Sequence, residues 1–359
     1  MSDLSMTISN LTLKLGLSGL KPGVRRDLAD IFSSFVSRNG QGRHESIQVV
    51  PIKTWRSKTI DPLLESLIRE KLQIPLRRFP FAGDFEAEIE RSWKNLRPYI
   101  REKASDLHLW GRDPGEDTDL YQLSRGLLIR NRLTSESILF VKQWSMRRSK
   151  VAAVYGAAYF VSAMGLPRSG GLLLHGVGIR RKGQGCLFLG LSGEGKTTIG
   201  EFAAPEEMIA DDGIILEREG PDVFLSPTPF DQKASFGPDT GKPRAERSRL
   251  AIGFFLRKDS RVYVERVSPA EACAVILKNH IHFFRYFSSD ITAKALGLAA
   301  EMCRRVPFYR LHFKKDSSFW SLVERLKNEP WSPSAPPEAG KPQNIQCRMS
   351  NVKGKIRGD

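Results

Sequence analysis

An eight-residue stretch near the middle of the chain constrains the fold more than any other feature. Residues 190–197 read GLSGEGKT and fit the pattern GxxxxGK[ST] at every position. An apolar run at 186–189 leads directly into this stretch, and residues 198–203 suit a helix. In a strand–loop–helix of this kind the glycines let backbone N–H groups turn inward around phosphate oxygens. The sequence therefore predicts a loop that binds the phosphates of a nucleotide.

Each residue type in this loop suits part of that task. Lys196 is expected to place its charge on the β- and γ-phosphates of ATP, and the hydroxyl of Thr197 to hold the nucleotide-bound Mg²⁺. The helix that follows adds the favourable dipole of its N-terminus. The predicted nucleotide-binding residues are Gly190, Ser192, Gly193, Gly195, Lys196, Thr197 and Thr198.

Two adjacent carboxylates, Asp211 and Asp212, stand at the end of the next apolar run. Carboxylates at a strand end are costly to bury unless a metal or a donor neutralises them, and beside a phosphate loop that metal is magnesium. One carboxylate would hold the ion, and the other would accept a proton from a substrate hydroxyl. A solvated Asp-Asp-Gly turn is the alternative interpretation.

Histidines offer weaker signals. His175 ends the apolar run 172–174, fifteen residues before Gly190, and such a histidine is more often structural than functional. His280 and His282 are two residues apart and would point the same way on a strand, but no third metal ligand stands out. We interpret the latter two as structural.

The chain is expected to contain two folded regions. Residues 1–150 carry strand-like runs at 11–15 and 47–52 and a helical run at 24–36, which indicates an α+β region with no recognisable chemistry. Helices are expected at 62–72 and 85–103, and a loop at 112–119. Residues 151–328 alternate short apolar strands with glycine turns and helices, which predicts an α/β catalytic domain. The tail, 329–359, is rich in Pro, Gly and basic residues and is expected to be disordered.

Composition limits the setting. Lys and Arg total 56 against 40 Asp and Glu, a net charge of +16, but the positive charge is scattered, which argues against nucleic acid as the partner. Four cysteines without CxxC spacing argue against a disulfide framework or zinc cluster and suggest a reducing compartment, the cytoplasm. The apolar segment 151–167 is short for a membrane span and rich in Gly and Ala, so we expect a buried helix under a sheet.

The order of these motifs resembles the catalytic domain of bacterial HPr kinase/phosphorylase. The elements are His175-Gly176, the phosphate loop and Ala210-Asp211-Asp212, and the similarity covers roughly residues 170–325. Within that family the chain is most similar to shorter HPr-kinase-like proteins found near peptide-modification genes, including lasso-peptide tailoring kinases. Those relatives share a Thr-Pro-aromatic element, here 228–230, and a late VPxYxLxF…FW stretch, here 306–313 and 319–320.

This resemblance implies a P-loop in a phosphoenolpyruvate-carboxykinase-like arrangement with a mixed, largely antiparallel sheet. By position, Asp211 would be the base that activates a serine hydroxyl, with His175 nearby, and Asp212 would join Thr197 at magnesium. The two aspartates are interchangeable on sequence alone. The family's later glycine-rich signature is absent between 218 and 250, which argues against phosphorolysis and against HPr as the substrate. That region instead carries Lys233, Lys242, Arg244, Arg247 and Arg249, each a candidate arginine finger or a solvated loop residue.

We therefore expect an ATP-dependent, Mg²⁺-assisted kinase whose acceptor is a hydroxyl, a serine in a peptide or protein. An acidic or precursor peptide suits the net positive charge, and the family's kinases often form homo-oligomers. Three alternatives remain open: a kinase for free serine, a non-catalytic nucleotide-binding regulator, and, ranked lowest, a switching hydrolase. Intact Asp211 and His175 argue against the regulator, because binding alone needs neither.

Overall fold

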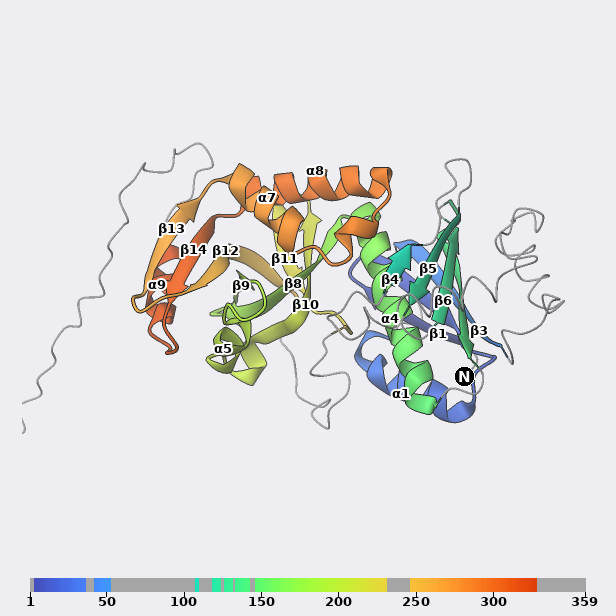
Figure 1. Ribbon diagram of the computed structural model, residues 1–359. Helices are drawn as coiled ribbons and strands as arrows, with labels where there is room; N and C mark the ends of the chain where they lie inside the picture. The colour runs from blue at the N-terminus through green and yellow to red at the C-terminus, as the bar shows by residue number, and fades with distance from the viewer. Residues whose placement is uncertain are drawn as a thin grey trace, which may run out of the picture.

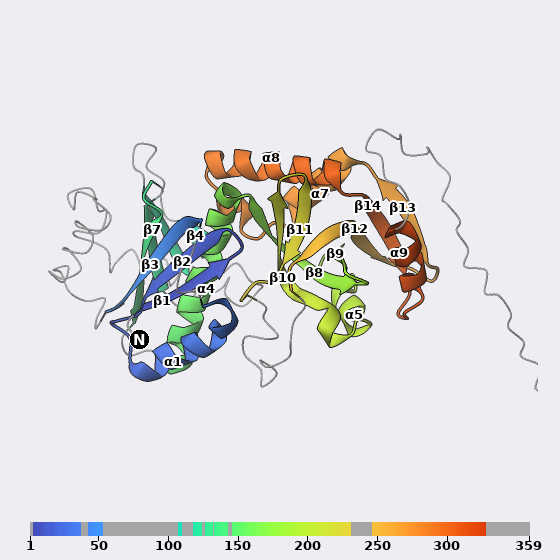
Figure 2. The same ribbon diagram turned by 180° about the vertical axis from the view of Figure 1, so that it is seen from behind.

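The computed structural model describes residues 3–36, 42–52, 107–109, 118–123, 126–131, 133–142, 146–230 and 246–327. Two mixed β-sheets stand side by side, and a long helix, α4 (Arg147–Gly165), lies between them (Figures 1 and 2). The first sheet comes from the N-terminal half of the chain and the second from the C-terminal half. The predicted α+β character with mixed sheets is confirmed.

The first sheet has the strand order β1-β2-β3-β7-β6-β5-β4. Its central strands β2, β3 and β7 are parallel, and the outer pairs are antiparallel. Helix α1 (Pro22–Ile31) and the short turn η1 (Ser33–Phe35) connect β2 to β3. The strands are β1 (Asp3–Ile8), β2 (Leu11–Gly16), β3 (Arg43–Ile52), β4 (Leu107–Leu109), β5 (Thr118–Leu123), β6 (Gly126–Asn131) and β7 (Glu136–Lys142).

The second sheet has the order β11-β10-β8-β9-β12-β14-β13, with an added pairing between β11 and β12. Most of its pairs are antiparallel, as the family resemblance implies. Within the described part of this second sheet, only β9, β12 and β14 run parallel to one another. The strands are β8 (Gly171–Arg181), β9 (Gln184–Leu189), β10 (Met208–Glu219), β11 (Asp222–Ser226), β12 (Ser248–Lys258), β13 (Tyr263–Val267) and β14 (Phe308–Phe313).

The parallel strands position the phosphate loop. Strand β9 is buried along nearly its whole length and ends at Leu189, and helix α5 (Lys196–Glu201) begins after the loop. Because parallel neighbours end at the same edge of a sheet, the end of β12 lies beside the loop and the end of β14 follows next to it. Behind it, Phe313 of β14 and Phe319 of α9 (Phe319–Lys327) belong to one buried cluster with Phe188 of β9.

Helix α4 is buried on almost all sides, as the apolar segment 151–167 predicts. It ends in the turn η3 (Leu166–Ser169), which leads into β8. Phe230, which closes the Thr-Pro-aromatic element, stacks on Tyr159 of α4 with ring centroids 4.8 Å apart. A single buried apolar cluster therefore contains residues of both sheets and α4. No described helix is long and apolar enough to cross a membrane.

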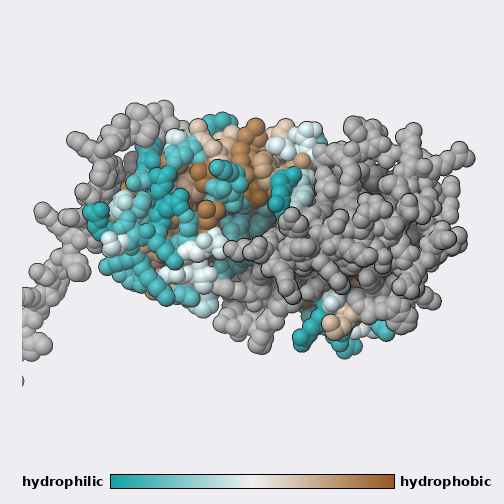
Figure 3. All heavy atoms as spheres, in the orientation of Figure 1, coloured by the Kyte–Doolittle hydropathy of each residue, from teal (hydrophilic) through white to brown (hydrophobic). Residues whose placement is uncertain are grey.

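Helices α7 (Pro269–Asn279) and α8 (Ser289–Arg305) cover one face of the second sheet (Figure 1). Ser268 is the N-cap of α7, because its side chain accepts a hydrogen bond from the Glu271 N–H. The turns η4 (Pro205–Glu207) and η5 (Phe284–Tyr286) complete the domain. Polar residues dominate the visible surface of this half, and apolar residues gather around α7 and α8 (Figure 3).

The structure corrects one local prediction and leaves others outside the described residues. Asp211 and Asp212 were expected at the end of an apolar strand, but β10 continues from Met208 to Glu219, so both residues lie inside a strand. The pairing with β8 continues through both residues, because their backbone groups, not their side chains, form the ladder. The helices at 62–72 and 85–103, most of the 112–119 loop and the tail 329–359 lie outside the described residues.

Candidate functional site

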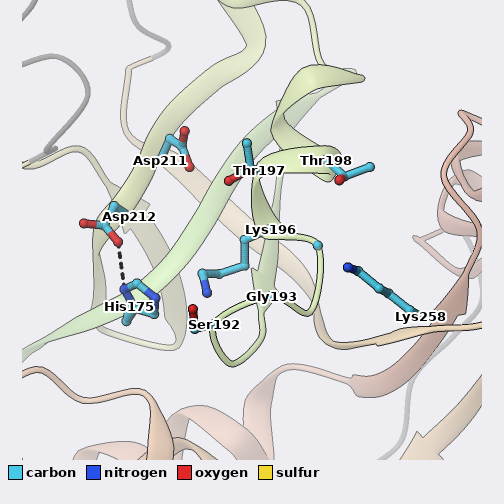
Figure 4. A pocket seen from close by; sticks show the side chains of 10 residues that line it. His175, Ser192, Gly193, Lys196, Thr197, Thr198, Asp211, Asp212 and Lys258 are labelled. Carbon is cyan, nitrogen blue, oxygen red and sulfur yellow. Dashed lines mark ion pairs between the residues drawn. The ribbon is translucent and has the colours of Figure 1, made fainter. Parts of the chain in front are cut away.

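A pocket of about 410 Å³ opens at the loop edge of the second sheet, within the size range of small-ligand sites, ~300–1,000 Å³. Every side chain predicted to act in catalysis or metal binding lines it, together with most of the predicted loop residues (Figure 4). The lining residues are His175, Ser192, Gly193, Gly195, Lys196, Thr197, Thr198, Asp211, Asp212 and Lys258.

Two glycines allow the loop to turn. Gly193 and Gly195 have φ angles of 84° and 103°, in the left-handed region that side chains disfavour. A Cβ at Gly195 would also come within 2.6 Å of the Phe313 ring. Glycine is therefore the residue best suited to both positions, which supports the interpretation of the motif.

Lys196 reaches back across the loop. Its ammonium group donates hydrogen bonds to the carbonyl oxygens of Gly190 and Leu191, at 2.7 and 3.3 Å. Burial lowers the pKa of Lys196, and the nearby carboxylates of Asp212 and Asp211 partly counteract this shift. The positive charge of Lys196 is thus held inside the pocket, opposite the two aspartates.

Glu194 stabilises the loop through two contacts of its carboxylate. Its carboxylate accepts a hydrogen bond from the Leu191 N–H and forms an ion pair with Arg257 of β12. The contact joins the loop to the neighbouring strand, and the sequence pattern leaves this position unspecified.

The backbone explains how two adjacent residues of one strand face the same pocket. Successive side chains of a regular strand point to opposite faces. In β10 the register shifts between Met208 and Ala210, and Asp212 has a φ of 109°. This left-handed conformation is rare outside glycine and signals strain, which is often stored at functional sites.

His175 pairs with Asp212 and not with Asp211. The Nδ1 atom of His175 lies 2.8 Å from Oδ1 of Asp212, and Figure 4 shows the two side chains directed at each other from β8 and β10. Burial raises the pKa of Asp212, but the hydrogen bond to His175, together with the electrostatic effect of His175, His282 and Lys196, outweighs it, so the pKa lies below its ordinary value. Asp212 is therefore ionised at neutral pH.

Asp211 points toward Thr197 rather than toward His175 (Figure 4). A carboxylate and a hydroxyl oxygen are ligands that Mg²⁺ accepts, and Mg²⁺ is commonly held by one or two carboxylates plus substrate phosphates. The described residues contain no cluster of three or more His, Cys, Asp or Glu side chains that would form an all-protein metal site. The chemistry of this pair thus fits a nucleotide-bound magnesium ion.

His282, interpreted as structural from sequence, lies directly behind the pair of His175 and Asp212. Its ring centroid is 5.5 Å from that of His175, and its side chain hydrogen-bonds the backbone of Asp212. Burial lowers the pKa of His282 to about 4, so the ring is neutral. His282 thus contacts the site through His175 and Asp212 and does not line the pocket. The only feature of the sequence that pointed to His282 was its spacing from His280.

His280 is a second histidine that is buried close to the site. Its side chain is 3% exposed, and its Nδ1 has no hydrogen-bond partner among the described residues. Burial, together with the charges of His175 and Lys196, lowers the pKa of His280 to about 4, below the 6.5 of an exposed histidine. The unfolded chain therefore takes up a proton more readily between pH 6.5 and 4, and stability falls as the pH falls through this window.

We accordingly expect acidification from pH 7 to pH 5 to lower the free energy of unfolding by about 2 kcal/mol through His280. Urea unfolding of the wild type and of a His280→Gln variant at both pH values measures this. The variant should lose less stability than the wild type on acidification. An equal loss in both proteins would contradict the assignment of a neutral, buried His280.

The sequence interpretation missed Lys258, which lines the pocket from the end of β12. It lies beside the loop because β12 runs parallel to β9, a pairing that sequence spacing does not show. Of the basic residues proposed as arginine fingers, Lys233, Lys242 and Arg244 lie outside the described residues.

Arg247 and Arg249 lie near the other end of β12, roughly 30 Å from Lys258 at the usual rise per residue. They form ion pairs there with Glu217, Glu219 and Asp222. The structure does not bring these two arginines to the loop.

Comparisons with known proteins complete the description. A family model described as "SynChlorMet cassette protein ScmC" matches residues 143–328, slightly more than half of the chain. No curated protein matches the chain. The structure of the Hpr(Ser) kinase/phosphatase from Coxiella burnetii is similar over 43% of this chain and 87% of that chain, with 15% sequence identity and a TM-score of 0.24. That likeness is distant.

Proposed function

The chain belongs to the SynChlorMet cassette protein ScmC family, and we propose that it is a kinase that transfers the γ-phosphate of ATP to a hydroxyl group. One observation carries the proposal: the phosphate loop, two carboxylates and His175 line a single pocket. A site for nucleotide binding alone has no need of a histidine–carboxylate pair within reach of the loop. A phosphoryl transfer to a hydroxyl needs such a group to accept the proton.

We assign the proton acceptor to the pair of Asp212 and His175. The ionised carboxylate of Asp212 has one oxygen bonded to His175, and the other oxygen is the candidate acceptor for the hydroxyl proton. From the sequence, Asp211 was the first choice for the base, but the roles of the two aspartates were interchangeable. We now assign the base to Asp212.

Asp211 and Thr197 would hold the magnesium ion, which offsets charge on the phosphates when bound. Lys196 would bind the β- and γ-phosphates and counter the negative charge that develops during transfer. These groups are held in place before reaction, by the loop glycines and by strand β10, so that little reorganisation is needed.

The acceptor we propose is a serine hydroxyl in a peptide or protein. Two features support it: the sequence resemblance to HPr-kinase-like proteins, and the net charge of +16, which favours an acidic partner. A precursor peptide from a modification cluster fits both. The proposal for the acceptor rests on resemblance and charge, and not on the geometry of the pocket.

The direct test is transfer of labelled γ-phosphate from ATP in the presence of Mg²⁺. Free serine, HPr and short peptides encoded beside the gene are offered as acceptors, with Asp212→Asn as the control. We expect label on a peptide or protein that is absent with the variant. Label on free serine would indicate the small-molecule kinase. Tight ATP binding without any transfer would indicate a regulatory nucleotide-binding protein.

A further inference from the structure

Lys258 is the second cation of the pocket, and its charge is not neutralised by any described carboxylate. Its neighbours differ in this respect: Arg257 forms an ion pair with Glu194, and Asp259 contacts His312 at 3.2 Å. Lys258 is exposed at the end of β12 and faces the pocket (Figure 4). An unpaired lysine beside a phosphate loop is a ready site for an anion.

The position of Lys258 beside the loop follows from the sheet. Strands β9 and β12 run parallel, and their last paired residues are Leu189 and Phe255. The loop follows Leu189, and Lys258 follows Phe255 by three residues, so both lie at the same edge of the second sheet. Close packing fixes the separation here, because a Cβ placed on Gly190 would lie 3.3 Å from the Cβ of Leu256.

Lys258 and the catalytic groups lie on opposite flanks of the loop. In Figure 4 the pair of His175 and Asp212 lies on one side of Lys196, and Lys258 lies on the other side, beyond Gly193 and Thr198, with its ammonium group directed at the loop. In loops of this type the motif lysine reaches the β- and γ-phosphates, and the backbone N–H groups hold the α- and β-phosphates. The flank of Lys258 therefore corresponds to the end of the triphosphate that is not transferred.

We propose that Lys258 binds the α- or β-phosphate of the nucleotide and acts in nucleotide affinity rather than in the transfer step. This rests on the proposed function, because it assumes a nucleotide in the loop. A compact, freely rotating ammonium group suits phosphate oxygens whose exact orientation is set by the loop backbone. Both ATP and ADP present these phosphates, so Lys258 contributes to binding of substrate and product alike.

The test is equilibrium binding of ATP and of ADP, each with Mg²⁺, to the full-length protein. Lys258→Ala is expected to raise both dissociation constants by about tenfold, the usual scale for one charge-assisted hydrogen bond. Lys258→Arg should restore most of the affinity because it keeps the charge. The loss should shrink at high salt, because the side chain is exposed. Lys294→Ala, which removes an exposed charge from α8, is the matched control and should change neither constant.

Each other outcome overturns the inference in a distinct way. Unchanged affinity in Lys258→Ala, with tight binding by the wild type, would remove Lys258 from the nucleotide site and leave the proposed kinase intact. A loss for ATP but not for ADP would place Lys258 at the γ-phosphate. An effect only on the KM of the acceptor would make it an acceptor-binding residue. Absence of nucleotide binding by the wild type would overturn the proposed function itself.

Discussion

The Asp212→Asn variant is expected to bind ATP with unchanged affinity and to lose phosphoryl transfer by about a thousandfold. A positioned general base contributes about 10²–10⁴-fold to such a reaction, and an amide cannot accept the proton. Asparagine is the suitable replacement, because it keeps the shape of the side chain and tolerates the left-handed backbone found at Asp212, where φ is 109°. Single-turnover transfer and equilibrium binding measure the two quantities separately.

Asp211→Asn is the matched comparison, since it removes a carboxylate from the adjacent position of the same strand. We expect this variant to need a higher Mg²⁺ concentration for half-maximal rate, because Asp211 is placed with Thr197 at the proposed metal site. If Asp211→Asn instead kept its Mg²⁺ dependence and lost transfer, while Asp212→Asn shifted the Mg²⁺ requirement, the two aspartates would have the opposite roles. The His175–Asp212 pair would then be a structural contact.

The second large effect is expected for Lys196→Ala, which should weaken ATP binding by about a hundredfold and lower the transfer rate further. The side chain is partly desolvated, and a charged hydrogen bond in such a setting contributes roughly 1.5–3 kcal/mol. The charge also acts on the transferring group, where it is more valuable in the transition state than in the ground state. The dissociation constant and the single-turnover rate therefore both report on this residue.

Lys196 also closes the loop through hydrogen bonds to Gly190 and Leu191, so loss of the charge must be separated from loss of loop structure. Lys196→Gln retains an N–H donor for these carbonyl groups but carries no charge. Equal losses in the Ala and Gln variants would assign the effect to the charge. Normal ATP binding and transfer by Lys196→Gln would show that the residue serves only to shape the loop.

Local patterns were enough to predict the loop and the elements around it. The glycines of the motif were expected to permit an inward turn, and Gly193 and Gly195 have the left-handed backbone that such a turn requires. The apolar segment 151–167 was expected to form a buried helix, and it lies in the buried helix α4 and the turn η3. Each of these features depends on residues close together in the sequence, so it can be predicted without knowledge of the fold.

The partners within the site depended on contacts between distant segments. The sequence identified His175 and both aspartates but did not show which aspartate the histidine contacts, because that depends on the register between β8 and β10. Strand alternation predicts one side chain on each face of the sheet, whereas the irregular backbone of β10 brings both to the pocket.

The sequence by itself predicted the glycine-rich loop, most of the residues that line the pocket beside it, and the buried character of α4, because these follow from the order of side chains along one segment. The tertiary structure alone decided that Asp212 pairs with His175, that His282 stands behind them, and that Lys258 joins the loop. The physical reason is that strand pairing brings together residues separated by tens of positions, and neither composition nor spacing records which strands become neighbours.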